Sequence, residues 1–127
     1  AKIPGDMQGR SLVPLLKGQS PKNWRTSIYY HYYEYPSFHM VPRHYGIRTE
    51  RYKLMHFYRF GNEWEMYDLQ NDPDELNNLY GKKGTAKLAV NLKKQLYILQ
   101  KQYGDDSDTS EMPQEWKDRV RPGTAQK

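Results

Sequence analysis

The sequence predicts an α+β domain: a small antiparallel sheet of about four strands packed against a long C-terminal helix. Two observations support this prediction. Four short segments rich in aromatic and β-branched residues follow one another with short connections, a pattern that favours antiparallel pairing. A longer segment then repeats apolar residues every three or four positions, as one face of a helix does. Sheet and helix together predict a two-layer domain.

The four predicted strands lie between residues 27 and 69. They are SIYYHYYEY (27–35), HYGIRT (44–49), YKLMHFY (52–58) and EWEMYDL (63–69). Pro36 ends the first strand, and the Gly-Asn pair at residues 61–62 predicts a hairpin turn before the last. Because side chains alternate along a strand, the first strand has two aromatic faces. One face carries Ile28, Tyr30 and Tyr32, and the other carries Tyr29, His31 and Tyr33.

Two short helical segments are predicted on either side of these strands. Ser11 can cap a short helix that Gly18 ends, with Pro14 tolerated in its first turn. Residues 71–81 read as a helical turn that Asp72 caps, with a proline at its first position.

The long helix is predicted from roughly Ala86 to Tyr103. Thr85 is its expected cap, and Gly104 is well placed to end it. The lysines of this segment lie mostly off its apolar stripe, so the stripe should pack on the sheet. The stripe consists of Ala89, Leu92, Leu96, Leu99 and Tyr103.

Length and composition indicate one domain with a wet surface. We expect residues 1–10 to be a connector, residues 11–104 to form the domain and residues 105–127 to be a polar tail. Twelve tyrosines supply much of the apolar area, which is typical of a core close to an interface. The net charge of +5, from 20 Lys and Arg against 15 Asp and Glu, favours anionic partners without identifying them. No stretch approaches the roughly 18 apolar residues of a membrane span.

The stretch YYHYYEYPSFHMVPRHYG (29–46) is the best candidate for a binding site. Its loop is bounded by prolines, and stiff loops on a sheet place side chains reproducibly. His39, Arg43 and His44 would present donors for an anion or a sugar hydroxyl. Tyr33 and Tyr35 would offer rings for a sugar face. Packing of the tyrosines and a solvated Arg43 explain the same pattern equally well. His31 and Glu34 could instead pair within the sheet or its interface.

Known catalytic and metal-binding patterns are missing from the sequence. There is no G-x-S-x-G elbow, no phosphate-binding loop and no H-E-x-x-H motif. The absence of cysteine excludes disulfides and thiolate metal sites within the chain. The four histidines are not at usual zinc-ligand spacings, and a helix start accounts for the acidic residues near position 72. The sequence therefore predicts no catalytic residue and no metal site.

The order of motifs resembles the C-terminal subdomain of type I sulfatases, in the alkaline phosphatase superfamily. The matching pieces are DMQGRSLVPLLKG (6–18), WRTSIYYHYYEYP (24–36), HYGIRTERYKLMHFY (44–58) and EWEMYDLQNDPDELNNLYG (63–81). Among these enzymes the chain looks most like carbohydrate sulfatases that act on glycosaminoglycans. N-acetylglucosamine-6-sulfatases and relatives of iduronate-sulfatase are examples.

The resemblance implies that the catalytic apparatus lies outside this chain. In the family, a larger N-terminal domain carries a formylglycine, made in a C/S-x-P-x-R motif, and a Ca²⁺ ion. The chain has no such motif, so it looks like a C-terminal fragment that is inactive alone. Its implied partners are its own catalytic domain and a sulfated carbohydrate, which His39, Arg43, His44 and Tyr35 would contact. The implied location is exported, either periplasmic or extracellular, or lysosomal.

Two readings from other classes remain open at this point. The chain could be a stand-alone binding module for anionic glycans. It could also bind nucleic acid, because aromatic platforms beside Lys and Arg can stack bases. The cations are spread along the chain and no RNA-recognition signature is present, so no nucleic acid is expected.

Overall fold

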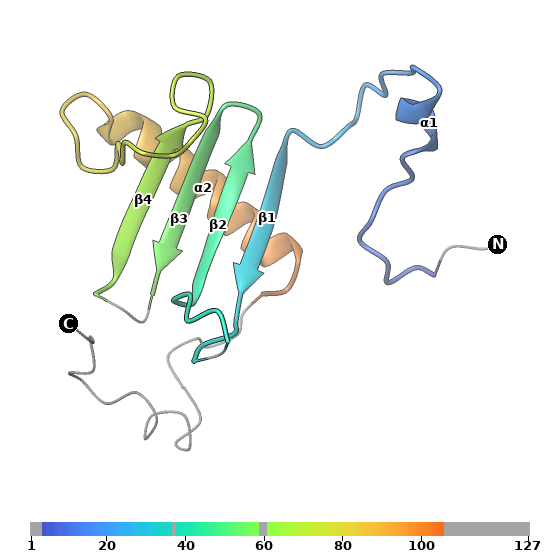
Figure 1. Ribbon diagram of the computed structural model, residues 1–127. Helices are drawn as coiled ribbons and strands as arrows, with labels where there is room; N and C mark the ends of the chain where they lie inside the picture. Colours follow the sequence, from blue (N-terminus) through green and yellow to red (C-terminus); the bar gives the residue numbers. More distant parts are fainter. Residues whose placement is uncertain (1–3, 37, 59–60, 106–127) are drawn as a thin grey trace.

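The computed structural model describes residues 4–36, 38–58 and 61–105. Its elements, in chain order, are α1 (Val13–Leu16), β1 (Ser27–Tyr32), β2 (His44–Thr49), β3 (Tyr52–Phe57), β4 (Glu63–Asp68) and α2 (Ala86–Gln102). The strands form one antiparallel sheet in sequence order, and α2 crosses one face of it (Figure 1). The predicted α+β architecture is confirmed. Among the described residues, neither helix has the length and apolar character that a bilayer crossing requires.

The core lies between α2 and the sheet. Strand register aligns Ile47, Leu54 and Met66 in one row across three strands, and none of them is exposed. The predicted stripe of α2 covers this row through Ala89, Leu92 and Leu96, with Leu99 packed at its margin. Burial of each large apolar side chain contributes roughly 1.5–3 kcal/mol, so this row and stripe fix the face on which α2 lies.

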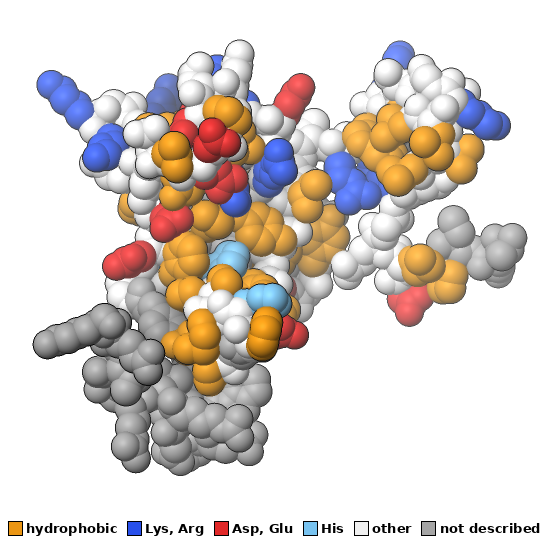
Figure 2. All heavy atoms as spheres, in the orientation of Figure 1, with side chains coloured by type: hydrophobic (Ala, Val, Ile, Leu, Met, Phe, Trp, Pro, Cys, Tyr) orange, Lys and Arg blue, Asp and Glu red, His pale blue; other side chains and the backbone are white. Residues whose placement is uncertain are grey.

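On the opposite face of the sheet, a glycine in β2 leaves space for a tyrosine ring of β1. Tyr30 pairs with Gly46, which pairs in turn with Met55. The Tyr30 ring lies against Gly46, where a Cβ atom would be 2.5 Å from the Tyr30 hydroxyl. This open face is the one turned to the viewer in Figure 2, where hydrophobic side chains gather over the strands.

The segment 71–81 is not helical, contrary to the prediction. Asp72 accepts hydrogen bonds from the backbone N–H groups of Leu76 and Asn77, four and five residues later, so it does not cap a helical turn. Glu75 has a φ of 54°, which is incompatible with a right-handed helical turn there. Beyond it, the Asn78 side chain bonds to the backbone of β4 at both Met66 and Trp64. These hydrogen bonds to β4 take the place of the helical hydrogen bonds that the sequence predicted for the segment.

Smaller differences concern element ends. β1 stops at Tyr32, three residues before the predicted end. Thr85 does not cap α2 through its side chain, because its hydroxyl donates to the carbonyls of Leu79 and Lys82. Gly104 ends the long helix as predicted, with a φ of 63° that suits glycine. The Ser11 hydroxyl accepts a bond from the N–H of Val13, at the start of the four-residue α1.

An Arg–Asp pair joins the turn between β2 and β3 to the end of β4, and it predicts a response to acid. Arg51 donates two hydrogen bonds to Asp68, at 3.0 and 2.7 Å, and lowers the pKa of that carboxyl to about 2. The unfolded pKa of Asp is about 3.9, so the ionised pair stabilises the fold above that pH. This contribution should disappear as the pH falls from about 4 to about 2.

Urea unfolding at several pH values checks this expectation. Asp68→Asn should lower the unfolding midpoint at neutral pH, and its difference from the wild type should shrink below pH 4. Asp74→Asn removes an exposed carboxyl of the 71–81 segment and serves as the control. A constant difference between wild type and Asp68→Asn down to pH 2 would contradict the assigned role of the pair.

Candidate functional site

A buried polar cluster joins β1 to the end of α2. His31 Nδ1 lies 2.7 Å from Asp105 Oδ2, and these side chains are only 3% and 10% exposed. On its other side, His31 Nε2 lies 3.0 Å from the Tyr58 hydroxyl. Tyr29 and Tyr33 also donate to Asp105 through their hydroxyls. Burial, followed by the bond to Asp105, raises the pKa of Tyr29 well above its usual range.

This cluster was not anticipated from the sequence. The structure gives His31 the partners Asp105 and Tyr58 rather than Glu34. Both ring nitrogens of His31 are engaged, so its ring plane is fixed, and Tyr33 stacks on it at 3.8 Å. The cluster fixes the end of β1, from which the candidate loop departs.

His56 is also accounted for by the fold. Its ring nitrogens contact the Tyr45 hydroxyl at 2.7 Å and Asn62 Oδ1 at 2.5 Å. The ring stacks on Trp64 at 4.1 Å, and burial lowers the pKa of His56. A histidine in this position is a satisfied core residue, which leaves His39 and His44 as the histidines available for binding.

The loop after β1 and the first residue of β2 hold the four predicted binding residues in different environments. Tyr35, at its base, is only 9% exposed, whereas His39 is exposed beyond it. Arg43 and His44 are half-buried where the loop enters β2. The structure thus places Tyr35 in a buried position, His39 in an exposed position, and Arg43 and His44 in half-buried positions.

The His44 ring is held in place by its neighbours. Its Nδ1 lies 2.8 Å from the carbonyl oxygen of Pro42. The ring stacks on the Tyr32 ring, with 5.6 Å between ring centres, and it lies at a tilt to the Phe57 ring, with 5.0 Å between ring centres. Nδ1 faces the carbonyl, so Nε2 is the ring nitrogen that has no hydrogen bond among the described residues. Histidine and hydrophobic side chains lie together at this end of the open face (Figure 2).

The open face combines apolar area with buried hydroxyl groups. The hydroxyls of Tyr30 and Tyr32 are buried without a hydrogen-bond partner among the described residues. Burial raises the pKa of Tyr30 above its ordinary range. Tyr67, near the far edge, donates to Glu65 at 2.9 Å, and burial followed by this bond raises its pKa to about 12. Buried hydroxyls without partners are costly, and a further polypeptide on this face would relieve the cost.

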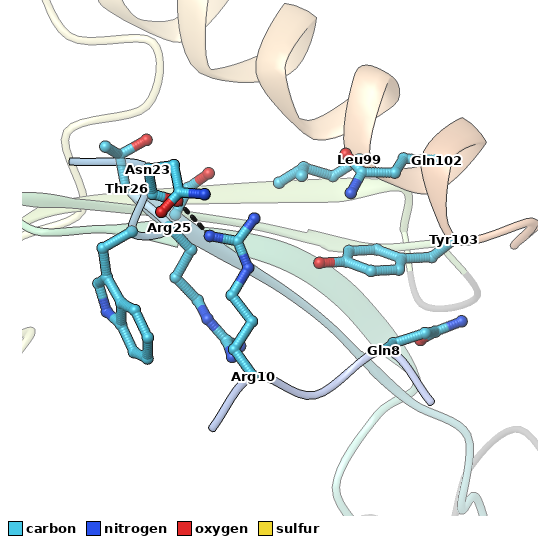
Figure 3. A pocket seen from close by; sticks show the side chains of 10 residues that line it. Gln8, Arg10, Asn23, Arg25, Thr26, Leu99, Gln102 and Tyr103 are labelled. Carbon is cyan, nitrogen blue, oxygen red and sulfur yellow. Dashed lines mark hydrogen bonds between the residues drawn. The ribbon is translucent and has the colours of Figure 1, made fainter. Parts of the chain in front are cut away.

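A polar pocket of about 390 Å³ lies between the N-terminal segment and the end of α2. Arg10 and Arg25 come from the N-terminal segment, while Leu99 and Tyr103 belong to the α2 side (Figure 3). The guanidinium of Arg10 donates to the carbonyl of Asn23, which turns it across the pocket. The loop residues predicted for binding do not line this pocket.

No metal-ligand group is found in the part of the chain that the structure describes. Its His, Asp and Glu side chains nowhere gather in a group of three or more that could hold a metal ion. The resemblance places its Ca²⁺ ion in the catalytic domain, and the described residues offer no group of ligands for such an ion, so no catalytic step is assigned to them.

Fold and site together define a small α+β domain, whose described residues supply aromatic, basic and hydrogen-bonding groups around a sheet. The chain belongs to the family of C-terminal domains of N-sulphoglucosamine sulphohydrolase, whose family model matches residues 1–102. The resemblance to sulfatases of the alkaline phosphatase superfamily is thereby confirmed.

Individual relatives agree with this family. The chain is 52% identical over 113 residues to an N-acetylglucosamine-6-O-sulfatase of Bacteroides thetaiotaomicron, covering 87% of this chain and 20% of that protein. It matches the structure of BT4656 in complex with its substrate D-glucosamine-2-N,6-O-disulfate with a TM-score of 0.80 and 49% identity, covering 87% and 23% of the two chains. BT1596, a 2-O glycosaminoglycan sulfatase, matches with a TM-score of 0.72 and 26% identity, covering 83% and 22%.

The matched region is a small part of each relative. The chain spans about a fifth of the length of the curated relatives it matches. Another of these is a multifunctional alkaline phosphatase superfamily protein of Trinickia caryophylli, 31% identical over 98 residues and covering 68% of this chain.

Proposed function

We propose that this chain is the C-terminal domain of a sulfatase that hydrolyses sulfate esters of carbohydrates, with sulfated glucosamine as the substrate class. The observation that carries the proposal is 52% identity, over 87% of the chain, to an N-acetylglucosamine-6-O-sulfatase. A structural relative bound to a disulfated glucosamine supports the same class. The bacterial relatives favour an exported enzyme, in the periplasm or outside the cell, over a lysosomal one.

The chemistry is assigned to the preceding catalytic domain. A formylglycine and Ca²⁺ held there would supply the nucleophile and the charge stabilisation for sulfate ester hydrolysis. The described residues of this chain offer neither a metal-ligand group nor a C/S-x-P-x-R motif. Their role in the proposal is to bind the sugar and to support the catalytic domain.

Sugar binding is assigned to the loop after β1 and the start of β2. His39 is exposed there, and Arg43 provides a cation suited to a sulfate or carboxylate. The His44 ring is oriented by Pro42 and by stacking on Tyr32, which leaves Nε2 to contact a hydroxyl group. Tyr35 is assigned more weakly, because its ring is buried at the base of the loop.

The open face of the sheet is the surface that we assign to the catalytic domain. It carries the buried hydroxyls of Tyr30 and Tyr32, which lack partners among the described residues. At its outer edge, Ile28 is 49% exposed and lines a pocket of about 700 Å³ with Leu12, Leu15 and Trp24. Exposed apolar surface beside buried polar groups is typical of an interface.

The alternative of a stand-alone module for anionic glycans is less favoured. The family model covers residues 1–102, and the relatives at 52% and 35% identity are both sulfatases several times longer than the matched region. A module that works alone would not explain why the aromatic face opposite α2 holds buried hydroxyls without partners.

Sulfate release tests the proposal directly. The natural protein that contains this chain should release sulfate from glucosamine 6-sulfate in the presence of Ca²⁺, whereas residues 1–127 alone should not. The isolated chain is assayed with an aryl sulfate as well, after a second purification. Turnover that persists in the isolated chain, and is lost in a point variant of it, would show that the chemistry lies here.

A further inference from the structure

The side of α2 that faces away from the sheet carries an exposed patch. Val90, Tyr97 and Ile98 are 65%, 50% and 57% exposed there. A hollow of about 500 Å³ lies over this side of the helix, with almost wholly apolar walls apart from lysine ends. We call this surface the outer α2 patch, and it consists of Lys87, Val90, Lys94, Tyr97, Ile98 and Lys101.

The charge on this helix is of one sign. α2 contains four lysines and neither Asp nor Glu. Lys93 is turned toward the sheet edge, where its ammonium lies 2.7 Å from the Tyr80 hydroxyl and 3.8 Å from the centre of the Trp64 ring. The other three lysines are exposed, and they take part in none of the ion pairs found among the described residues. These three are Lys87, Lys94 and Lys101.

The spacing of these lysines arranges them in a row along the helix axis. They follow one another at intervals of seven residues, which is roughly 10 Å along a helix axis. A seven-residue interval drifts by only about 20° around a helix, so the three ammonium groups form a row on one side. Tyr97 and Ile98 lie beside this row and add an apolar surface. A row of cations beside an aromatic ring suits an extended polymer that carries repeated negative charges.

We propose that the outer α2 patch binds a sulfated polysaccharide chain. The ammonium groups of the lysine row pair with sulfate groups, and Tyr97 packs against the face of a sugar ring. The proposal rests on the proposed function, because that function supplies a sulfated glycan as the partner. The glycan would then have two contact sites on this domain. One is the loop after β1, and the other is the outer α2 patch.

An anionic membrane surface fits the patch less well. Helices that lie in a membrane interface bury a broad apolar face rich in Trp, Phe and Leu. The broad apolar stripe of α2 is already in the core, through Leu92 and Leu96. What remains outside is Val90, Tyr97 and Ile98, which would bury little area in lipid.

Binding to immobilised heparin by the full-length natural protein tests the proposal. Lys94→Gln combined with Lys101→Gln should weaken binding roughly tenfold, since each exposed ion pair contributes little and two are lost. The same variant should show a shallower dependence of affinity on salt, because fewer counterions are released. Lys17→Gln combined with Lys22→Gln removes the same charge from exposed positions of the N-terminal segment and should change little.

Three results would overturn the proposal. They are equal losses in both double variants, equal affinity for fully desulfated heparin, and lysine-dependent binding to phosphatidylserine vesicles without any loss on heparin. Hydrolysis of glucosamine 6-sulfate is measured in parallel and should be unchanged in both double variants. The wild type could hydrolyse no sulfated sugar while heparin binding is weakened only in the Lys94 and Lys101 double variant. In that case the proposed function fails and the binding site stands.

Discussion

Replacing Arg43 with alanine in the full-length protein should lower kcat/KM for glucosamine 6-sulfate roughly ten- to a hundred-fold. A small aryl sulfate should be hydrolysed at nearly the wild-type rate. The physical reason is that the assigned contact is to the sugar and not to the reacting sulfur. Loss of one charge-assisted hydrogen bond costs about 1.5–3 kcal/mol, and an aryl sulfate does not form that bond. His44→Ala should show the same selectivity.

Folding must be separated from binding in this experiment. His44 packs between Tyr32 and Phe57, so thermal unfolding of each variant is measured first. Val41→Ala, at a 38% exposed position of the same loop, is the control for loop integrity. With unchanged melting, equal losses on both substrates would place Arg43 or His44 in the chemistry or its geometry. No loss on either substrate would mean that the loop faces solvent.

Gly46→Ala should destabilise the domain by about 2–3 kcal/mol, which is the upper part of the range for overpacked sites. A Cβ atom at Gly46 would lie 2.5 Å from the carbonyl oxygen of Leu54 and 2.5 Å from the Tyr30 hydroxyl. The carbonyl belongs to the neighbouring strand and cannot move without loss of pairing. Thermal unfolding of the natural protein is the measurement, and Gly46→Val should be worse than alanine.

The control for this substitution is Gly9→Ala, where the added Cβ meets nothing within 4 Å. Combining Gly46→Ala with Tyr30→Phe should recover only part of the stability. The hydroxyl contact is then removed, but the Leu54 carbonyl and the Tyr30 ring carbon at 2.7 Å remain. Full recovery in the double variant, or no loss in Gly46→Ala, would show that the strands can separate locally at little cost.

Local patterns were sufficient to predict most of the fold. Residues 44–49 form β2 with the predicted bounds, because aromatic and β-branched residues there lie between a proline-bounded loop and a tight turn. The helix stripe followed from its period alone, and its buried members are Ala89, Leu92 and Leu96. These elements depend on neighbours in sequence, which a single sequence displays.

Long-range contacts decided what the sequence could not show. Asp72 and the proline after it are sound helix-start signals, yet the Asn78 side chain binds β4, twelve and fourteen residues earlier in the chain. The pairing of His31 with Asp105 spans 74 residues, and its acid lies at the start of a segment expected to be a polar tail. The four loop residues assigned to sugar binding stay a prediction, because their partner is outside this chain.

The bond between His31 and Asp105 also bears on the order in which the domain assembles. The four strands pair only with their neighbours in sequence, so the sheet can form from successive hairpins as the chain leaves the ribosome. α2 must then return to β1, and Asp105 reaches His31 and Tyr29 only after the last turn of that helix is complete. A chain that stops before residue 105 would leave this corner of the sheet without its carboxylate. We therefore expect the contacts of Asp105 with His31 and Tyr29 to be among the last to form when the domain folds.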